Sequence, residues 1–112
     1  MVFDTLKSML DNNTPEISPQ EVEEKDLLVI DTRRKSAYQN GHIPGAINLT
    51  YGQIKNKQLE KLADVNKDET IAVVCVAGIS SKKASKVLIE AGYENAKSMS
   101  GGMRAWQGQL ET

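Results

Sequence analysis

The sequence predicts an α/β domain in which helices cover both faces of a parallel sheet. Three observations support this fold class. Short apolar runs alternate with helical patterns along the chain, as they do in parallel sheets. Two of these runs, Leu27–Ile30 and Ile71–Val74, are apolar at every position, which is typical of strands buried on both faces. The length of 112 residues suits one compact domain.

The composition narrows the possible functions. The formal net charge is −1, so the sequence predicts no basic surface for nucleic acid. No apolar stretch approaches the ~20 residues that a membrane helix needs, and the N-terminal residues lack the basic region and apolar core of a secretory signal. A single cysteine cannot form an internal disulfide, which fits a reducing compartment. We therefore expect a cytoplasmic protein that binds neither a membrane nor nucleic acid.

The first 14 residues are predicted to form a helical extension, and residues 15–112 are predicted to form the domain itself. Apolar side chains recur in the extension at helical spacing, which predicts an amphipathic helix. These side chains are Phe3, Leu6, Met9 and Leu10. The stripe is expected to pack on the domain, with a dimer contact as the alternative.

The domain is predicted to begin with a brief edge strand and a short helix. The strand starts at Ile17. Ser18 is placed to cap the helix, Pro19 suits its first turn, and Glu21 would complete a capping box. The apolar run Leu27–Ile30 is then the first buried strand.

Helices and strands alternate through the middle of the chain. A short helix is predicted over Lys35–Gln39, where Asn40-Gly41 ends it. A strand is predicted over Ala46–Leu49. The spacing of apolar residues then predicts a helix across residues 53–62.

The C-terminal part continues this alternation after the strand Ile71–Val74. An apolar stripe predicts a helix from Ser80 to Ala91, which Gly92 ends. A strand is predicted over Ala96–Met99. A last helix is predicted through Met103, Ala105 and Trp106, with the indole ring packed in the core.

Three polar clusters follow strands of the predicted sheet: Asp31–Arg33, the turn near Tyr51, and Cys75 with the loop after it. Ligands bind such sheets outside the carboxyl ends of the strands. The clusters therefore lie where this topology places a site.

The only cysteine, Cys75, directly follows the second all-apolar strand. The small residues Ala77 and Gly78 allow the backbone to curl, and a helical pattern begins at Ser80. In this arrangement the backbone N–H groups and the helix dipole stabilise a thiolate. The sequence predicts a reactive thiol that holds an anion, with a small core residue as the alternative.

Polar side chains after the loop add to this prediction. Ser80 and Ser81 can cap the helix and donate hydroxyl hydrogen bonds. Lys82 and Lys83 add positive charge, although a solvated helix face also explains these two lysines.

The residues around Cys75 distinguish between possible reactions. Phosphoryl transfer by a cysteine uses an arginine that closes the same loop, but Ser81 stands at that position. Acyl transfer needs a histidine base, and the sole histidine, His42, lies in a turn that favours bonding of its ring to local backbone. One cysteine and one histidine are too few ligands for a metal. Sulfur transfer needs only one thiolate and amides that hold a second sulfur, so we expect a persulfide and no bound cofactor or metal.

Two further motifs have both a structural and a functional interpretation. Asp31 and Arg33 suit a buried ion pair in which Arg33 reaches back into the domain and Asp31 caps local amides. Lining of the site is the alternative for this pair. Gly101-Gly102 could open an anion site at a helix N-terminus, and a tight turn explains these glycines as well.

Three segments resemble signatures of the rhodanese family, in the family's order and spacing. The first is Val29–Arg33 followed by Tyr38 and by Gly41–Leu49. The second is Val74-Cys75-x-x-Gly78-x-Ser80-Ser81 followed by Ala84, and the third is Gly101-Gly102-Met103-x-Ala105-Trp106. The chain therefore resembles a single-domain rhodanese, a sulfurtransferase homology domain, over roughly residues 15–110.

The resemblance implies a five-stranded, mostly parallel sheet with flanking helices. It implies that Cys75 carries the persulfide, and that Asp31, Arg33 and His42 support the structure of the site. The residues whose amides would cradle the outer sulfur are Val76, Ala77, Gly78, Ile79, Ser80 and Ser81. Thiosulfate is the usual test donor for such domains, with cyanide or a thiol as acceptor. The loop has the length expected for sulfur, one residue shorter than in the phosphatases of this fold.

The chain departs from the family pattern at two positions of the loop. Many active members carry a basic residue directly after the cysteine and an arginine before the final serine, where this chain has Val76 and Ser80. Loss of these charges predicts weak turnover of thiosulfate, and a persulfide or a protein partner as the donor. A non-catalytic module that regulates or binds other proteins is the alternative function.

Overall fold

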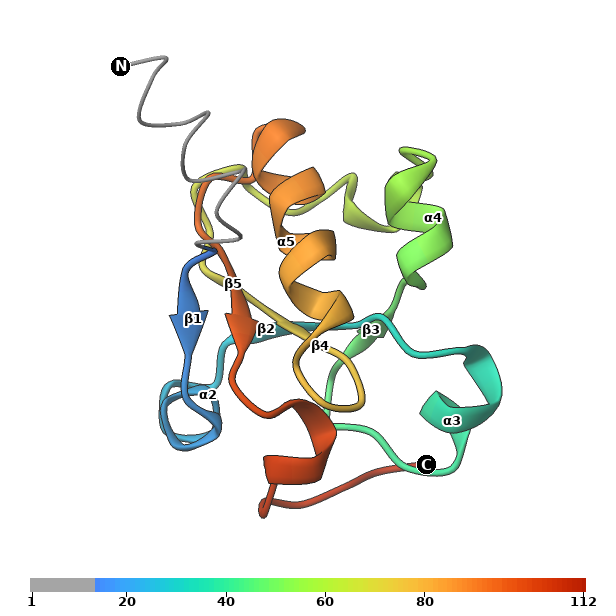
Figure 1. Ribbon diagram of the computed structural model, residues 1–112, viewed down its shortest axis with the longest axis vertical. Helices are drawn as coiled ribbons and strands as arrows, with labels where there is room; N and C mark the ends of the chain where they lie inside the picture. The colour runs from blue at the N-terminus through green and yellow to red at the C-terminus, as the bar shows by residue number, and fades with distance from the viewer. Residues whose placement is uncertain (1–13) are drawn as a thin grey trace.

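Within residues 14–112, five parallel strands form one sheet at the centre of the domain (Figure 1). The computed structural model describes residues 14–112, so the helical extension predicted for residues 1–14 falls almost wholly outside the described residues. The strand order across the sheet is β1-β5-β4-β2-β3. The strands are β1 (Glu16–Ile17), β2 (Leu28–Asp31), β3 (Ile47–Asn48), β4 (Ile71–Val74) and β5 (Ala96–Met99). Each strand pairs with its neighbours in parallel, which confirms the predicted α/β fold class.

Helices cover both faces of this sheet, as predicted from the sequence (Figure 1). The helices are α2 (Pro19–Lys25), α3 (Lys35–Gln39), α4 (Tyr51–Lys55) and α5 (Ser80–Glu90), with 3-10 turns η1 (Glu60–Leu62) and η2 (Gly102–Ala105). No helix among residues 14–112 is long and apolar enough to cross a membrane.

Strand β4 shows how the sheet divides the core. All four of its residues are fully buried. Ile71 and Val73 belong to a cluster with Leu88 of α5, whereas Ala72 and Val74 belong to a second cluster with residues of α2. Side chains alternate between the two faces of a strand, so a strand that is apolar at every position supplies both clusters.

The start of α2 differs in one detail from the prediction. Ser18 caps the helix and accepts the Glu21 N–H at 3.1 Å. The Glu21 carboxylate, however, pairs with Lys25 at 2.8 Å. A complete capping box occurs instead in α4, between Thr50 and Gln53.

The helix predicted across residues 53–62 is wrong. Helix α4 ends at Lys55, Lys57 adopts a left-handed φ of 60°, and only the short turn η1 follows. Ile54 and Leu62 are both fully buried in the same cluster. Their spacing resembles one helix because two separate elements bury side chains in the same part of the core.

The predicted last helix is only the 3-10 turn η2. Gly101 and Gly102 have positive φ angles of 75° and 61°, and Trp106 is extended. The N–H groups of Met103 and Arg104 bond outside the turn, to the Cys75 and Val76 carbonyls. Trp106 packs against the core as predicted.

Candidate active site

A cavity of about 260 Å³ opens beside the loop that joins β4 to α5. Strands β2 and β4 are parallel neighbours, so the segments that follow them meet at the same edge of the sheet. Thr32 is held there because its N–H and its hydroxyl both donate to the Val74 carbonyl, at 2.9 and 2.8 Å. The cavity is lined by Thr32, Arg33, Cys75, Val76, Ala77, Ile79 and Ser80.

Two of the three polar clusters predicted from the sequence therefore come together. The third, the turn near Tyr51, is not part of the cavity lining. The Tyr51 N–H donates to the Thr32 carbonyl at 3.3 Å, so this turn is bonded to a residue of the cavity wall.

Cys75 lines this cavity and is only 4% exposed. Its Sγ accepts the Gly78 N–H at 3.0 Å and lies 3.3 Å from the Ser81 hydroxyl oxygen. Gly78 has a φ of +88°, a conformation that turns its amide inward and that other residues rarely adopt. A backbone donor and a hydroxyl therefore converge on the sulfur.

These contacts change the acidity of Cys75. Burial raises the pKa, because it disfavours the charged thiolate. Hydrogen bonds from the Ser81 and Ser80 hydroxyls and from the Ser81 and Gly78 N–H groups oppose this effect and together lower the pKa to about 7. A large fraction of the sulfur is therefore thiolate near neutral pH.

A second serine, Ser98 of β5, extends this arrangement. Its hydroxyl oxygen lies 2.7 Å from that of Ser81, and both residues are fully buried. When Ser81 donates to the thiolate, Ser98 is the group that can donate to Ser81. Ser98 was not predicted from the sequence as a functional residue, because its contact with Ser81 depends on the pairing of β5 with β4.

The prediction that Ser80 and Ser81 cap α5 is wrong. The residue that precedes the first turn is Ile79, and no side chain caps the helix. The Ser81 hydroxyl is engaged with Cys75 and Ser98 instead.

The turn at Gly101-Gly102 holds the Cys75 loop from below. A Cβ atom on Gly102 would lie 2.5 Å from the Cys75 carbonyl oxygen and 2.7 Å from the Gly78 nitrogen. The Met103 N–H donates to that same Cys75 carbonyl at 2.8 Å. The tight-turn interpretation accounts for both glycines: Gly102 lies too close to the Cys75 loop for a side chain, and a Cβ atom on Gly101 would lie 2.7 Å from that of Ala105 in the same turn.

Asp31 and Arg33 form the expected ion pair. Asp31 is fully buried and accepts the Arg33 main-chain N–H at 3.0 Å, while the Arg33 Nη2 atom lies 2.7 Å from its carboxylate. The same guanidinium donates to the Gly41 carbonyl at 2.8 Å. The pair joins the end of β2 to the turn after α3.

His42 lies in that turn and is not among the residues that line the Cys75 cavity. Its Nδ1 is 2.8 Å from the Tyr38 carbonyl oxygen, and its ring stacks on the Tyr38 ring at 3.7 Å. Bonding to local backbone, as the sequence analysis favours, is confirmed, and a general base at Cys75 is not supported.

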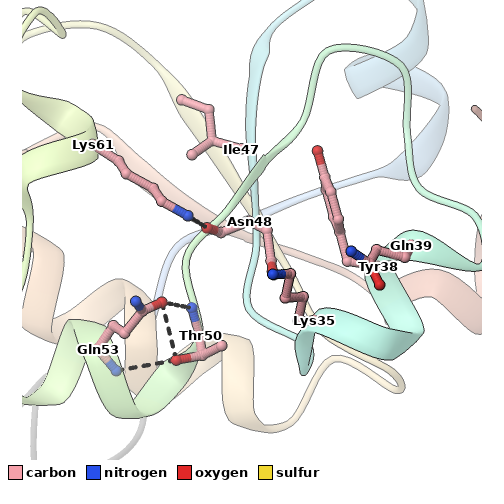
Figure 2. Close-up of a pocket in the computed structure, with 8 residues that line it drawn as sticks. All are labelled: Lys35, Tyr38, Gln39, Ile47, Asn48, Thr50, Gln53 and Lys61. Atoms are coloured by element: carbon pink, nitrogen blue, oxygen red, sulfur yellow. Dashed lines mark hydrogen bonds between the residues drawn. The ribbon is translucent and has the colours of Figure 1, made fainter. Parts of the chain in front are cut away.

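A larger cavity of about 760 Å³, the β3 cleft, lies along strand β3 and does not contain Cys75 (Figure 2). It is lined by Lys35, Tyr38, Gln39, Ile47, Asn48, Thr50, Gln53 and Lys61. The Lys61 ammonium donates to the Asn48 carbonyl at 2.7 Å, and the Asn48 amide bonds the carbonyls of Asp31 and Arg33. The cleft therefore backs onto the segment that forms one wall of the Cys75 cavity.

Comparison with known proteins identifies the family. The model of the rhodanese-like domain matches residues 14–109. The chain belongs to the rhodanese-like domain family. A thiosulfate sulfurtransferase, GlpE, of Pseudoalteromonas translucida is 37% identical over 77% of this chain and 78% of its own length. The GlpE of Shewanella oneidensis is 36% identical over 78% of this chain and 82% of its own length.

Solved rhodanese-like structures agree with this assignment. A rhodanese-like domain protein of Staphylococcus aureus superposes with a TM-score of 0.73 at 29% identity, and the match covers 87% of this chain and 96% of that one. The rhodanese-like fold of the chain therefore extends over nearly all the residues that the structure describes.

Proposed function

We propose that this protein is a sulfurtransferase that moves a sulfane sulfur from thiosulfate or a persulfide donor to a thiophilic acceptor through a persulfide on Cys75. The observation that carries the proposal is that Cys75 lines a cavity and that its sulfur lies 3.0 Å from the Gly78 nitrogen and 3.3 Å from the Ser81 hydroxyl oxygen. Relatives named thiosulfate sulfurtransferase, at 36–37% identity over most of the chain, support the same activity.

In the first step, the Cys75 thiolate attacks the outer sulfur of the donor. A bond forms between Sγ and that sulfur, and the bond between the two donor sulfurs breaks. The leaving group takes the bonding electron pair, so thiosulfate leaves as sulfite. The product is a persulfide anion, whose negative charge moves outward to the transferred sulfur. The amides of Val76–Ser81 are the donors that we assign to this sulfur.

In the second step, the acceptor attacks the outer sulfur and Cys75 leaves as a thiolate. A thiol of low pKa is the better leaving group, and the pKa of Cys75 is lowered to about 7. The same hydrogen bonds thus assist both steps: they make the thiolate available at neutral pH and stabilise it when it leaves. Any nucleophile able to reach the cavity, a small thiol or a thiol on a protein, suits this step.

The supporting residues act through the cavity walls in this proposal. The Asp31–Arg33 pair holds the segment that includes Thr32, and His42 holds the turn to which Arg33 is bonded. A reducing compartment such as the cytoplasm suits a mechanism that depends on a free thiol.

The test is the intact mass of the protein after incubation with thiosulfate or a polysulfide. The expected result is a gain of one sulfur atom on the wild-type chain and none on Cys75→Ser. Addition of a thiol or cyanide should remove the sulfur. Absence of an adduct with every donor, or an adduct that survives in Cys75→Ser, would overturn the proposal.

One observation favours a second candidate, a protein-interaction module. Val76 and Ile79 are 50% and 72% exposed beside the cavity, and apolar side chains of this kind are common in interfaces. A partner that binds Cys75→Ser as tightly as the wild type, together with absence of persulfide formation, would favour this candidate over the enzyme.

A further inference from the structure

The rim of the Cys75 cavity is unusually apolar for an exposed loop. Three large apolar side chains are exposed among the described residues: Val76 at 50%, Ile79 at 72% and Leu110 at 57%. Two of these three line the Cys75 cavity. Single exposed apolar residues are ordinary, but a pair at the entrance to a nucleophile offers a contact surface to whatever enters.

The charged side chain in the same lining is already held in an ion pair. Arg33 is the cation among the residues that line the cavity. Its guanidinium makes contacts of 2.7, 3.0 and 3.2 Å with the Asp31 carboxylate and one of 2.8 Å with the Gly41 carbonyl. Because Asp31 is fully buried, turning Arg33 toward a ligand would leave a buried carboxylate unpaired, which is strongly unfavourable.

The nearest lysine of α5 is also paired. Lys82 lies 3.1 Å from the Glu16 carboxylate of β1. Around the Cys75 sulfur, the groups that favour an anion are the Gly78 N–H and the Ser81 hydroxyl.

We propose that this site takes its sulfur from a small organic persulfide, R–S–SH with an uncharged R group, in preference to the dianion thiosulfate. The inference rests on the proposed function and specifies its donor. The alkyl part packs on Val76 and Ile79, and a cavity of about 260 Å³ accommodates a group of a few carbon atoms. Thiosulfate, by contrast, brings two negative charges toward a thiolate in a cavity whose lining cation, Arg33, is already paired with Asp31.

The reaction with this donor balances without any further reactant. The Cys75 thiolate attacks the terminal sulfur, a bond forms between Sγ and that sulfur, and the bond between the two donor sulfurs breaks. The donor leaves as the thiolate R–S⁻, taking the bonding electron pair. The proton of the donor stays on the transferred sulfur or passes to R–S⁻.

The test compares n-propyl persulfide with thiosulfate in single-turnover persulfidation of Cys75, followed by intact mass. Because the two donors differ in intrinsic reactivity, the ratio of their rates is divided by the same ratio for 2-mercaptoethanol, a small uncharged thiol. The expected normalised preference for propyl persulfide is about tenfold or more. A normalised ratio of one or less would overturn the inference.

Two substitutions sharpen this test. Val76→Arg adds a cation at the rim and should raise the thiosulfate rate by about tenfold relative to the propyl persulfide rate. Ile79→Ser removes apolar contact and should lower the propyl persulfide rate by about threefold relative to the thiosulfate rate. Gln20→Arg adds the same charge on exposed α2, away from the cavity, and should change neither rate.

The outcomes separate the two proposals. Persulfide from neither donor overturns the proposed function and this inference together. Persulfide from both donors, with a rate ratio that Val76→Arg and Ile79→Ser leave unchanged, supports the proposed function and overturns the donor assignment.

Discussion

The Cys75 cavity and the β3 cleft are both built on the segment that ends β2, yet they differ in size and in charge. The β3 cleft, of about 760 Å³, has two lysines in its lining and no nucleophile (Figure 2). The Cys75 cavity, of about 260 Å³, has a nucleophile and a cation that is committed to Asp31. The larger and more positive cavity is therefore not the one that holds the cysteine.

For the stabilisation of an anion, the kind of positive group and how firmly it is held therefore matter more than the number of charges in the lining. Lys35 and Lys61 are exposed side chains, and water screens their charge even though the Lys61 ammonium donates to the Asn48 carbonyl. The Gly78 N–H and the Ser81 hydroxyl are held by the fold, at 3.0 and 3.3 Å from the sulfur and away from water. Fixed donors in a buried site stabilise an anion more effectively than charges that solvent screens.

Loss of the nucleophile should have the largest effect. Cys75→Ser is expected to lower sulfur transfer by at least ~10³-fold, because a serine hydroxyl remains protonated at neutral pH. Lys35→Ala, in the lining of the β3 cleft, should leave transfer unchanged. The assay is sulfite release from thiosulfate or thiol release from a persulfide. A strong loss of sulfur transfer in Lys35→Ala would show that the β3 cleft takes part in the reaction. It would contradict the expected difference between the two cavities.

A Cβ atom at position 102 should damage the fold around the Cys75 cavity. Gly102→Ala is expected to destabilise the protein by about 2–4 kcal/mol, because of the clash with the Cys75 carbonyl and the positive φ. The matched control is Gly52→Ala in α4, beside the β3 cleft, where the nearest atom to the new Cβ lies at 4.0 Å. The control should be neutral or stabilising by up to about 1 kcal/mol. Chemical denaturation measures the free energy of unfolding of both variants. An equal loss of stability in the two would contradict the expected difference between Gly102 and Gly52.

The pH dependence of alkylation should distinguish a thiol in each region. The rate at Cys75 is expected to rise with pH through a midpoint near 7, since only the thiolate reacts and the pKa is lowered to about 7. Gln39→Cys in a Cys75→Ser background places a thiol at the β3 cleft, where a midpoint near the free value of ~8.5 is expected. Coincident midpoints would mean that the loop donors have no special effect.

The smallest effect is expected at Ser98. Ser98→Ala removes the group that holds the Ser81 hydroxyl, and should raise the alkylation midpoint of Cys75 by about half a unit to one unit. Ser85→Ala is the matched control, because this fully buried serine donates to the Ser81 main-chain carbonyl rather than to its hydroxyl. The control should lower stability by about 1 kcal/mol without moving the midpoint. If the alkylation midpoint shifted in Ser85→Ala and not in Ser98→Ala, Ser98 would have no effect on the acidity of Cys75 through Ser81.

Local sequence patterns correctly predicted the elements whose structure depends on residues close in the chain. The helix Lys35–Gln39 and the strands Ile71–Val74 and Ala96–Met99 have the bounds expected from the sequence. Continuous apolar runs mean burial on both faces wherever the strand lies. The Asp31–Arg33 pair was likewise predictable, because two residues of spacing bring the side chain of one to the main chain of the other.

Contacts between distant segments were decided by the tertiary structure. Ser81 and Ser98 meet because β4 and β5 are parallel neighbours and α5 connects them. The predicted last helix stops as a 3-10 turn because Trp106 is extended there and packs against the core, while the N–H groups of the turn bond the Cys75 loop.

The sequence by itself determined the sheet, the position of the cysteine at its edge and the small residues that let the loop curl. Only the tertiary structure decided which donors reach the sulfur and that the guanidinium beside it is occupied. The physical reason is the sequence separation of the interacting groups. Strand burial and loop conformation depend on residues that are close in the chain. The acidity of Cys75 and the charge of its cavity depend on groups that are distant in the chain and that packing brings together.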